Sequence, residues 1–145
     1  MQKPVLSGEA ILLNARVSDK ESAIKLAGRL LVENGFVEEA YVDKMLERER
    51  VTSTYIGNHV AIPHGTEEAK RLVKAAGISI VQIPEGVDFG DSQVAKLVIG
   101  IAGKGDEHLQ ILSNIALVCS DPKNVEKIVQ SQSKEALLSF FEGVN

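Results

Sequence analysis

Two periodicities of apolar positions alternate along this chain, one typical of helices and the other of strands. Apolar side chains recur at helical spacing in residues 18–35 and again in residues 38–49, so both segments are predicted to be helices. Ser18 and Glu21 form a capping-box pattern at the start of the first segment. Gly35 provides a C-terminal stop. The first helix is therefore expected to begin at Ser18 and to end before Gly35.

Short apolar runs predict strands at residues 10–13, 60–62, 75–82 and 97–102. The last run is almost entirely apolar, as expected of a central strand that is buried on both faces. Residues 84–91 are rich in turn-forming residues, and they predict a loop between the last two strands.

A third helix is predicted to begin at Asp106, which can cap it, and to end near Cys119. The apolar face of this helix is predicted to consist of Leu109, Leu112, Ala116 and Cys119.

Two more helix starts follow towards the C-terminus. Asp121 and Pro122 combine an N-cap residue with a first-turn proline. Ser133 begins a last helix that is expected to end near Gly143. Helices thus precede the strands and alternate with them, and no internal repeat or linker is visible. The sequence predicts a single α/β domain with a mixed β-sheet flanked by helices.

Composition narrows the classes of partner. The 145 residues are 44% hydrophobic and 25% charged, and the net charge of −4 gives no support for a nucleic-acid partner. The chain contains no run of eighteen apolar residues, which insertion into a membrane as a helix would need. The N-terminal residues lack the apolar stretch of a signal peptide. Cys119 is the only cysteine, so no intrachain disulfide forms. We expect a cytoplasmic protein.

Two histidines stand where loops are expected to begin after strands. His64 follows the run Val60-Ala61-Ile62-Pro63, and His108 opens the helix after the strand at residues 97–102. In open α/β sheets this edge is where ligands bind. A histidine can be a neutral nucleophile near pH 7, because its ordinary pKa is about 6.5. Taken one at a time, each histidine is better explained as an exposed residue of a turn or of a helix start.

Two other side chains suit a phosphoryl group at this edge. Thr66 follows His64 by two residues, and its hydroxyl can bond to a phosphoryl oxygen. Arg48 lies in the last turn of the second predicted helix. A guanidinium there can clamp a phosphoryl oxygen, or it can simply complement the helix dipole on a solvated face. The spacing does not choose between these interpretations of Arg48.

Two rival sites have weaker support. His59, His64 and His108 are a conceivable zinc set, but no cysteine pair or HExxH helix accompanies them. Cys119 with a histidine is a conceivable hydrolase pair. However, Cys119 falls on the apolar stripe of its predicted helix, where a free cysteine is commonly a small core residue. We therefore expect neither a metal nor a cysteine nucleophile.

Longer segments around these residues form a pattern in their order and spacing. They are Met45-Leu46-Glu47-Arg48-Glu49, Thr54-Tyr55-Ile56-Gly57-Asn58, Val60-Ala61-Ile62-Pro63-His64-Gly65-Thr66, Glu68-Ala69-Lys70, Pro84-Glu85-Gly86-Val87 with Phe89-Gly90, Leu97-Val98-Ile99-Gly100-Ile101-Ala102, and Glu107-His108. The pattern covers nearly the whole chain. It resembles the mannitol-type enzyme IIA of the bacterial phosphoenolpyruvate-dependent sugar phosphotransferase system.

The resemblance implies a phosphocarrier whose EIIA type-2 domain spans residues 1–145. His64 would accept a phosphoryl group from the histidine phosphocarrier protein and donate it to a cysteine of a IIB domain, for uptake of mannitol or a similar hexitol. His108 would lie beside it, and Arg48 would hold the phosphoryl oxygens. No metal or organic cofactor is implied. The alternative within the same superfamily is a regulatory IIA protein of the nitrogen-related type.

The chain departs from the family pattern at Asn58 and His59, where a Glu-Ser pair is usual in mannitol-type members. If the family glutamate orients the site, Asn58 must do so without charge, so Asn58 is a candidate supporting residue. His59 is expected to point elsewhere. Transfer between proteins also needs a docking surface, to which we expect Ile62, Pro63 and residues 87–89 to contribute.

Overall fold

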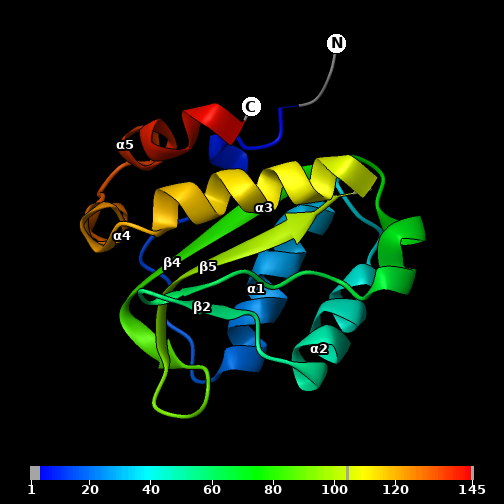
Figure 1. Ribbon diagram of the computed structural model, residues 1–145, viewed down its shortest axis with the longest axis horizontal. Coiled ribbons are helices and arrows are strands. Elements are labelled where there is room, and N and C mark those ends of the chain that lie inside the picture. The colour runs from blue at the N-terminus through cyan, green and yellow to red at the C-terminus, as the bar shows by residue number, and fades with distance from the viewer. Residues whose placement is uncertain (1–3, 104, 145) are drawn as a thin grey trace.

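Five strands form one mixed sheet at the centre of the protein, and helices cover both of its faces (Figure 1). The computed structural model describes residues 4–103 and 105–144, of which 105–107, 143 and 144 are described by their backbone alone. The predicted fold class is confirmed: one α/β domain with a mixed sheet flanked by helices.

The helices and strands follow one another as β1 (Ile11–Leu12), α1 (Lys20–Glu33), α2 (Tyr41–Val51), β2 (Tyr55–Gly57), β3 (Val60–Ala61), β4 (Gly77–Asp88), β5 (Val94–Ala102), α3 (Gly105–Cys119), α4 (Pro122–Gln130) and α5 (Lys134–Leu138). Short 3-10 helices are found at Gly8–Ala10, Glu67–Leu72 and Ser139–Val144.

The strands lie in the order β1-β4-β5-β3-β2. The long strands β4 and β5 are antiparallel and form the middle of the sheet. β1 pairs with β4 in parallel, β3 pairs with β5 in parallel, and β2 joins β3 as an antiparallel hairpin. Because β3 and β5 run in the same direction, the segments that follow them emerge at the same edge of the sheet.

Two hydrophobic cores lie on opposite faces of the sheet. One is formed with α1 and α2 and includes Ile24, Leu31 and Met45, each 0% exposed. The other is formed with the C-terminal helices and includes Ile115 and Ile128, also 0% exposed. Alternating side chains of β4 and β5 contribute to both cores, which explains the almost continuous apolar run of β5. Among the described residues, no helix has both the length and the hydropathy needed to cross a membrane.

The start of α1 differs from the predicted capping box by one residue. Asp19 is the N-cap, and its carboxylate accepts a hydrogen bond of 2.8 Å from the backbone N–H of Ser22. Asp19 and Ser22 have the same spacing as Ser18 and Glu21, and aspartate caps as well as serine does. The stop is confirmed, because α1 ends at Glu33 and Gly35 takes a left-handed φ of 77°.

The loop predicted at residues 84–91 is wrong over its first half. β4 continues to Asp88, and Val87 pairs with Ala95 of β5. Pro84 lies where the register between β4 and β5 shifts, and beyond the short stretch in which β1 pairs with β4. Proline is tolerated in a sheet at such an irregular, partly unpaired position.

The hairpin between β2 and β3 was not predicted, because the sequence analysis identified only the strand β3. Asn58 and His59 form its turn, with φ of 51° and 66°. Two adjacent left-handed residues are typical of a two-residue type I′ hairpin turn. The helix that precedes this hairpin, α2, begins at Tyr41 and not at the predicted Glu38.

The buried face of α3 matches the prediction only in part, since Cys119 is buried and Leu112 packs against the core. Ile111, Ile115 and Cys119, four residues apart, pack into the core, whereas Leu109 is 63% exposed. Ala116 is exposed as well. Apolar side chains occur on more than one side of this helix, so periodicity alone does not select the side that meets the sheet. The predicted cap at Asp106 involves a side chain outside the described part of the chain.

Both C-terminal helix starts are confirmed. Asp121 caps α4 with a hydrogen bond of 2.9 Å from the N–H of Lys123, and Pro122 is its first residue. Ser133 caps α5 through a hydrogen bond of 3.1 Å from the N–H of Ala136.

Candidate functional site

His64 lies at the carboxyl edge of the sheet, as predicted. It follows β3 and forms an isolated parallel bridge with Ile101 of β5, whose N–H donates a hydrogen bond of 2.9 Å to Pro63 O. The segment after β3 is therefore held against the end of β5. The residues that follow these two parallel strands meet at one place.

His108 lies beside His64, in the first turns of α3. The two imidazole rings are 5.4 Å apart between centroids, with an angle of 67° between their planes. Gly103 allows this approach, because a Cβ built on it would lie 2.8 Å from His108 Cα. Only glycine therefore fits between β5 and the start of α3 without displacing His108.

One hydrogen bond fixes the chemistry of His64. Its Nδ1 is 2.9 Å from the backbone O of Ile62. A carbonyl oxygen only accepts, so Nδ1 carries the hydrogen and donates it. In the neutral ring this leaves the lone pair on Nε2, the nitrogen far from the backbone, as the nucleophile.

The surroundings of both histidines favour the neutral ring. Burial, the largest effect, lowers the pKa of His64, and the charge of Arg48 lowers it as well. The hydrogen bond to Ile62 and the charge of Glu49 raise it, but the net effect is a lowered pKa. Burial lowers the pKa of His108 too, and the neighbouring His64 lowers it further. Near pH 7 the lone pair of His64 is consequently free to attack.

Arg48 and Thr66 line the same small cavity as the two histidines. Its volume is about 180 Å³, and its walls are formed by Tyr41, Arg48, His64, Gly65, Thr66, Glu67, Lys70, Val73, Gly103 and His108. The structure thus brings together four of the predicted site residues from α2, from the loop after β3 and from α3.

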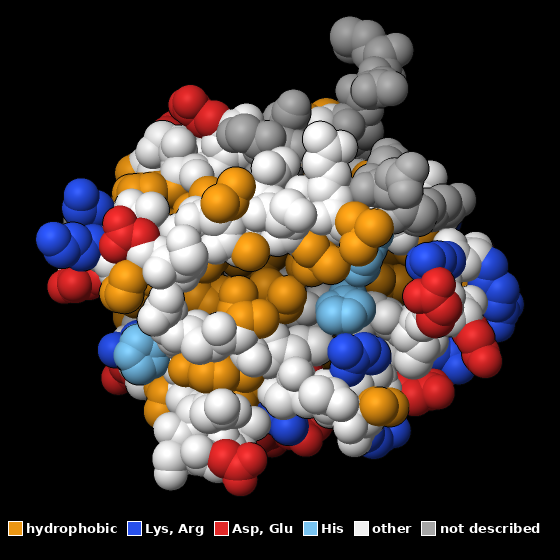
Figure 2. All heavy atoms as spheres, viewed as in Figure 1, with side chains coloured by type: hydrophobic (Ala, Val, Ile, Leu, Met, Phe, Trp, Pro, Cys, Tyr) orange, Lys and Arg blue, Asp and Glu red, His pale blue; other side chains and the backbone are white. Residues whose placement is uncertain are grey.

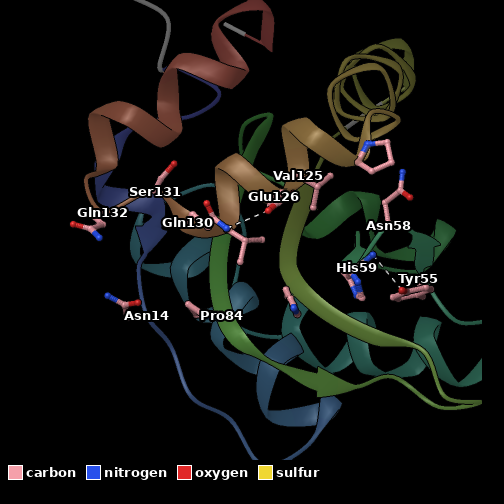
Figure 3. A pocket seen from close by; sticks show the side chains of 13 residues that line it. Asn14, Tyr55, Asn58, His59, Pro84, Val125, Glu126, Gln130, Ser131 and Gln132 are labelled. Atoms are coloured by element: carbon pink, nitrogen blue, oxygen red, sulfur yellow. Dashed lines mark hydrogen bonds between the residues drawn. The ribbon is translucent and has the colours of Figure 1, made fainter.

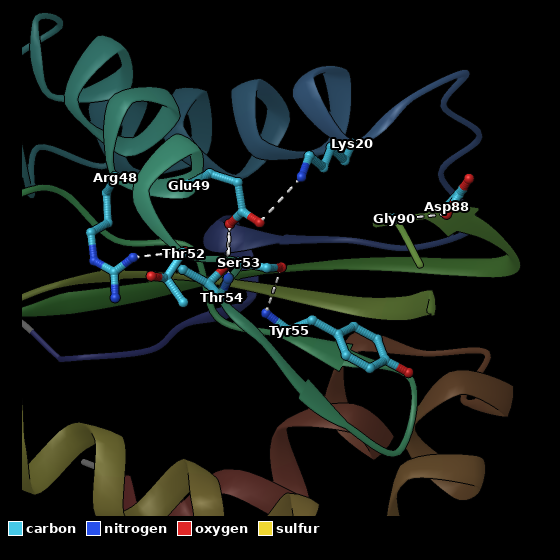
Figure 4. Close-up of polar contacts among 9 residues, drawn as sticks. All are labelled: Lys20, Arg48, Glu49, Thr52, Ser53, Thr54, Tyr55, Asp88 and Gly90. Atoms are coloured by element: carbon cyan, nitrogen blue, oxygen red, sulfur yellow. Dashed lines mark hydrogen bonds and ion pairs between the residues drawn. The ribbon is translucent and has the colours of Figure 1, made fainter. Parts of the chain in front are cut away.

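Arg48 is oriented by a hydrogen bond. Its Nη1 donates to the backbone O of Thr52 over 2.7 Å, which bends the guanidinium around the end of α2 (Figure 4). The remaining N–H donors of the guanidinium stay available for an anion in the cavity. The hydroxyl oxygen of Thr66 is buried and has no hydrogen-bond partner among the described residues.

Tyr41 is a site residue that the sequence did not reveal. Its hydroxyl accepts a hydrogen bond of 2.9 Å from Gly65 N–H and donates one of 2.8 Å to Ile101 O. Tyr41 therefore holds the residue after His64 against β5. The two partners are 24 and 60 residues away in sequence, and a tyrosine at the start of a helix gives no signal of either contact.

Lys70 and Glu67 are also wall residues to which the sequence analysis gave no role. The Lys70 ammonium is 2.7 Å from a Glu67 carboxylate oxygen at the rim. With Arg48, Lys70 gives the cavity a second cation. The helical spacing of three residues between Glu67 and Lys70 is a usable signal for the ion pair, but not for its place in the cavity.

Asn58 and His59 lie elsewhere, in the turn of the β2–β3 hairpin (Figure 3). The amide of Asn58 donates to the backbone O of Cys119 and of Ser120, over 3.0 and 3.3 Å, at the C-terminal end of α3. The structure therefore does not bring Asn58 together with His64 and His108, which lie at the opposite end of α3.

His59 points away from His64, as expected. Its Nδ1 is 2.9 Å from Val94 O, and its ring lines a separate surface hollow next to α4 (Figure 3). His59 lies in the left-handed turn of the hairpin, and this turn sets the direction of its side chain. The three histidines accordingly do not converge as a zinc set would require.

Cys119 is a core residue, as predicted. It is 3% exposed, and burial raises the pKa of its thiol to about 12. A thiol in this environment stays protonated at neutral pH and is a poor nucleophile.

The predicted docking loop at residues 87–89 is wrong. Phe89 is 2% exposed and packs near Tyr55, with ring centroids 6.4 Å apart, and Val87 is buried as well. Pro63 is also buried, so only Ile62, which is partly exposed, and Asp88, which is exposed, reach the surface among the residues of that set.

A different apolar surface adjoins the histidines. Figure 2 shows a hollow lined by hydrophobic side chains that runs below α3 to the histidines, with Lys and Arg side chains beside them. The large apolar side chains that are most exposed among the described residues include Val51 after Arg48 and Leu109 after His108, at 76% and 63%. Leu117 of α3, at 72%, adds to this set.

Comparisons with known proteins show the family of this chain. The family described as "Phosphoenolpyruvate-dependent sugar phosphotransferase system, EIIA 2" matches residues 4–144. The mannitol-specific phosphotransferase enzyme IIA component of Geobacillus stearothermophilus is 59% identical over 145 residues, which are 100% of both chains. Mannitol enzyme IIA of Escherichia coli, solved in complex with phosphorylated mannitol enzyme IIB, is 40% identical with a TM-score of 0.90, over 95% of this chain and 97% of that one.

A more distant structure is the nitrogen regulatory protein IIA-Ntr of Neisseria meningitidis. It is 27% identical with a TM-score of 0.81, over 94% of this chain and 96% of that one. By its sequence, its fold and the extent of the match, this chain belongs to the EIIA type 2 family of the phosphoenolpyruvate-dependent sugar phosphotransferase system.

Proposed function

We propose that this chain is the IIA component of a mannitol phosphotransferase system and that His64 carries the phosphoryl group. The observation that carries the proposal is the free Nε2 of a neutral His64 in a cavity shared with His108 and Arg48. The 59% identity to a mannitol-specific IIA component supports the choice of mannitol.

In the first half-reaction, the Nε2 lone pair of His64 attacks the phosphorus of the phosphohistidine on the histidine phosphocarrier protein. A nitrogen–phosphorus bond forms on His64 as the one on the donor breaks, and the electron pair returns to the donor imidazole. The hydrogen on His64 Nδ1 stays in its bond to Ile62 O. The donor ring leaves as a neutral imidazole when its other nitrogen carries a hydrogen, so no proton needs to move, and positioning and charge balance supply the catalysis.

Three side chains suit the charge that the phosphoryl oxygens carry. The Arg48 guanidinium supplies paired N–H donors and a positive charge. The neutral His108 donates one N–H across the 5.4 Å between the rings, near the start of a helix that favours anions. Thr66 would turn its unpartnered hydroxyl to a phosphoryl oxygen. Each interaction strengthens as the oxygens gain charge.

In the second half-reaction, a cysteine thiolate of a mannitol IIB domain attacks the phosphorus. The nitrogen–phosphorus bond breaks, and its electron pair returns to Nε2 of His64, which restores the starting ring. A shallow apolar surface beside the histidines suits successive docking of two proteins, and Leu109, the residue after His108, is exposed.

A nitrogen-related regulatory role is the alternative, and both roles would label His64. The lower identity of 27% to a nitrogen regulatory IIA protein favours the mannitol role. The two roles differ in whether the phosphoryl group moves on to a sugar-specific IIB cysteine.

The test is labelling by phosphoenolpyruvate, enzyme I and the phosphocarrier protein, for the wild type, His64→Ala and His108→Ala. We expect acid-labile label on the wild type, none on His64→Ala, and slow labelling of His108→Ala. A chase onto a mannitol IIB domain should move the label to its cysteine. An unlabelled wild type would refute the phosphocarrier role, and label that never leaves for IIB would favour the regulatory one.

A further inference from the structure

A buried carboxylate lies directly behind the candidate site. Glu49 follows Arg48 in the last turn of α2, and its side chain is 4% exposed (Figure 4). Arg48 lines the cavity, whereas Glu49 points into the protein. Acidic side chains are almost never fully buried unless they are paired, so this one calls for a physical reason.

The Glu49 carboxylate is bonded mainly to Thr54. One oxygen, Oε1, accepts a hydrogen bond of 2.6 Å from the Thr54 hydroxyl and another of 3.0 Å from the Thr54 backbone N–H. The other oxygen, Oε2, has no hydrogen bond among the described residues and lies 3.6 Å from the ammonium of Lys20. The acid is therefore paired on one side and incompletely satisfied on the other.

Stability alone does not account for such an arrangement. Replacing a buried ion pair by well-packed apolar side chains is often neutral or stabilising. Hydrogen bonds to a charged acceptor are instead short, strong and directional, which suits them to fixing a backbone segment. The Glu49–Thr54 pair joins the end of α2 to the segment that leads into β2.

From Thr54 the network continues to His64. The Thr54 backbone O accepts a hydrogen bond of 3.0 Å from Ile62 N–H. The backbone O of Ile62 in turn accepts the hydrogen of His64 Nδ1, over 2.9 Å. The carbonyl that sets the tautomer of His64 thus belongs to Ile62, the residue whose N–H is held by Thr54.

The same segment also orients Arg48. Arg48 Nη1 donates to Thr52 O, two residues before Thr54, over 2.7 Å. Glu49 fixes the far end of this short turn, so the position of Thr52 O depends on the Glu49–Thr54 bonds (Figure 4). Both the nucleophile and the guanidinium are then held by one buried acid.

We propose that Glu49 is the positioning residue of the phosphoryl site: its carboxylate fixes, through Thr54, the orientation of His64 and of Arg48. This inference rests on the proposed phosphocarrier function for its kinetic consequence, but the orientation of His64 is open to a separate measurement. The negative charge of Glu49 also partly offsets the effect of Arg48 on the pKa of His64.

The test compares four variants. Glu49→Gln removes the charge, and Thr54→Val removes the hydroxyl donor at nearly constant shape. Thr54→Ser keeps the hydroxyl and is the conservative rescue. Glu47→Gln removes an exposed carboxylate from the same helix, whose one ion pair among the described residues is with Lys44, and it is the matched control.

Two readouts are measured on each folded variant, with folding checked by circular dichroism and urea unfolding. Nitrogen-15 spectra give the fraction of neutral His64 with its hydrogen on Nδ1. Rapid-quench kinetics give the rate of transfer from the phosphorylated phosphocarrier and the KM for that donor.

We expect Glu49→Gln and Thr54→Val to lower the Nδ1–H fraction of His64 and to slow transfer by about tenfold or more, since small misplacements of reacting groups are costly. The KM for the donor should stay the same, because the docking surface is not altered. Thr54→Ser and Glu47→Gln should resemble the wild type in both readouts. If Glu49→Gln does not fold, the comparison of Thr54→Val with Thr54→Ser decides.

Wild-type tautomer fractions and transfer rates in folded Glu49→Gln and Thr54→Val would overturn the proposal and leave Glu49 a structural residue. That result would leave the phosphocarrier role intact, provided that the wild type is labelled. If the wild type is not labelled at all, the proposed function fails, and the nitrogen-15 readout still decides whether Glu49 orients His64.

Discussion

The phenol oxygen of Tyr41 accepts a hydrogen bond of 2.9 Å from the backbone N–H of Gly65, the residue directly after His64. The ring also packs against Gly65, where an added Cβ would lie 2.6 Å from Tyr41 Cε1. The same hydroxyl donates to Ile101 O of β5 over 2.8 Å. Burial raises the pKa of Tyr41, so the hydroxyl keeps the proton that it donates. Tyr41 therefore joins the His64 loop, α2 and the sheet at one point.

Tyr41→Phe tests this connection. Removing the hydroxyl leaves the partners Gly65 N–H and Ile101 O unpaired in the interior, which should lower the free energy of unfolding by about 1–3 kcal/mol. His64 should also lose its fixed position, so we expect phosphoryl transfer to slow by about tenfold. Urea unfolding and rapid-quench labelling measure the two effects.

Tyr55→Phe is the matched control for this variant. The Tyr55 hydroxyl also makes two hydrogen bonds, to Val94 O and from His59 N–H, but it lies in the β2–β3 hairpin away from the cavity. It should change stability slightly and transfer not at all. Equal transfer rates in Tyr41→Phe and Tyr55→Phe would mean that Tyr41 does not position His64.

The lowered pKa values of His64 and His108 predict how stability depends on pH. The unfolded chain protonates each histidine near its ordinary pKa of about 6.5, whereas the folded protein does so only at lower pH. Between the folded-state and the ordinary pKa values, the unfolded state binds more protons than the folded state, so the free energy of unfolding rises with pH. Stability is accordingly lost as the pH falls from about 7 through the two folded-state pKa values.

Urea unfolding between about pH 5 and about pH 8 measures this dependence across the range in which histidine titrates. The double variant His64→Gln, His108→Gln should show a shallower slope than the wild type, while both proteins retain His59. The same slope in both proteins would show that the two rings are protonated as easily in the folded state as in the unfolded chain.

Arg48→Ala should slow both labelling and transfer to IIB by about 100-fold or more, because a preorganised donor to the developing charge is lost. Arg50 lies two residues further along the same helix, is exposed and is absent from the cavity wall. Arg50→Ala, which removes the same net charge, should retain a rate within about twofold. Similar losses in both variants would assign the effect to overall charge and docking.

Cys119 should be inert in the folded protein. Its thiol is 3% exposed and its pKa is raised to about 12, so iodoacetamide should modify it only after unfolding in urea. Cys119→Ser should cost about 1–3 kcal/mol of stability by burying a hydroxyl, with no loss of phosphoryl transfer. Rapid modification of the folded protein, or a loss of transfer in a folded variant, would contradict its assignment to the core.

Local signals predicted much of the fold. Helix ends are set by residues close in sequence, as at the N-caps Asp121 and Ser133 and at Gly35, where α1 stops. Such signals can therefore be recognised from the sequence alone. Errors arose where tertiary contacts decide. Pro84 reads as a loop residue but lies in β4, where the irregular ladder accommodates it, and Leu109 reads as core but lies on the exposed side of α3.

The residues of the site also divide into those that the sequence predicted and those that depend on tertiary contacts. His64 and His108 follow parallel strands, and the topology of such strands accounts for their meeting. Tyr41 and Glu49 act through hydrogen bonds to Gly65 and Thr54 that depend on how α2 packs. Periodicity gives no information on such contacts.

The central claim is that Nε2 of His64 carries the phosphoryl group while Nδ1 stays bonded to Ile62 O. Phosphorus-31 and nitrogen-15 spectra of the phosphorylated protein measure the attachment directly. The account predicts a single phosphohistidine, with phosphorus coupled to Nε2 of His64. Phosphorus on Nδ1 of His64, on His108 or on His59 would contradict it.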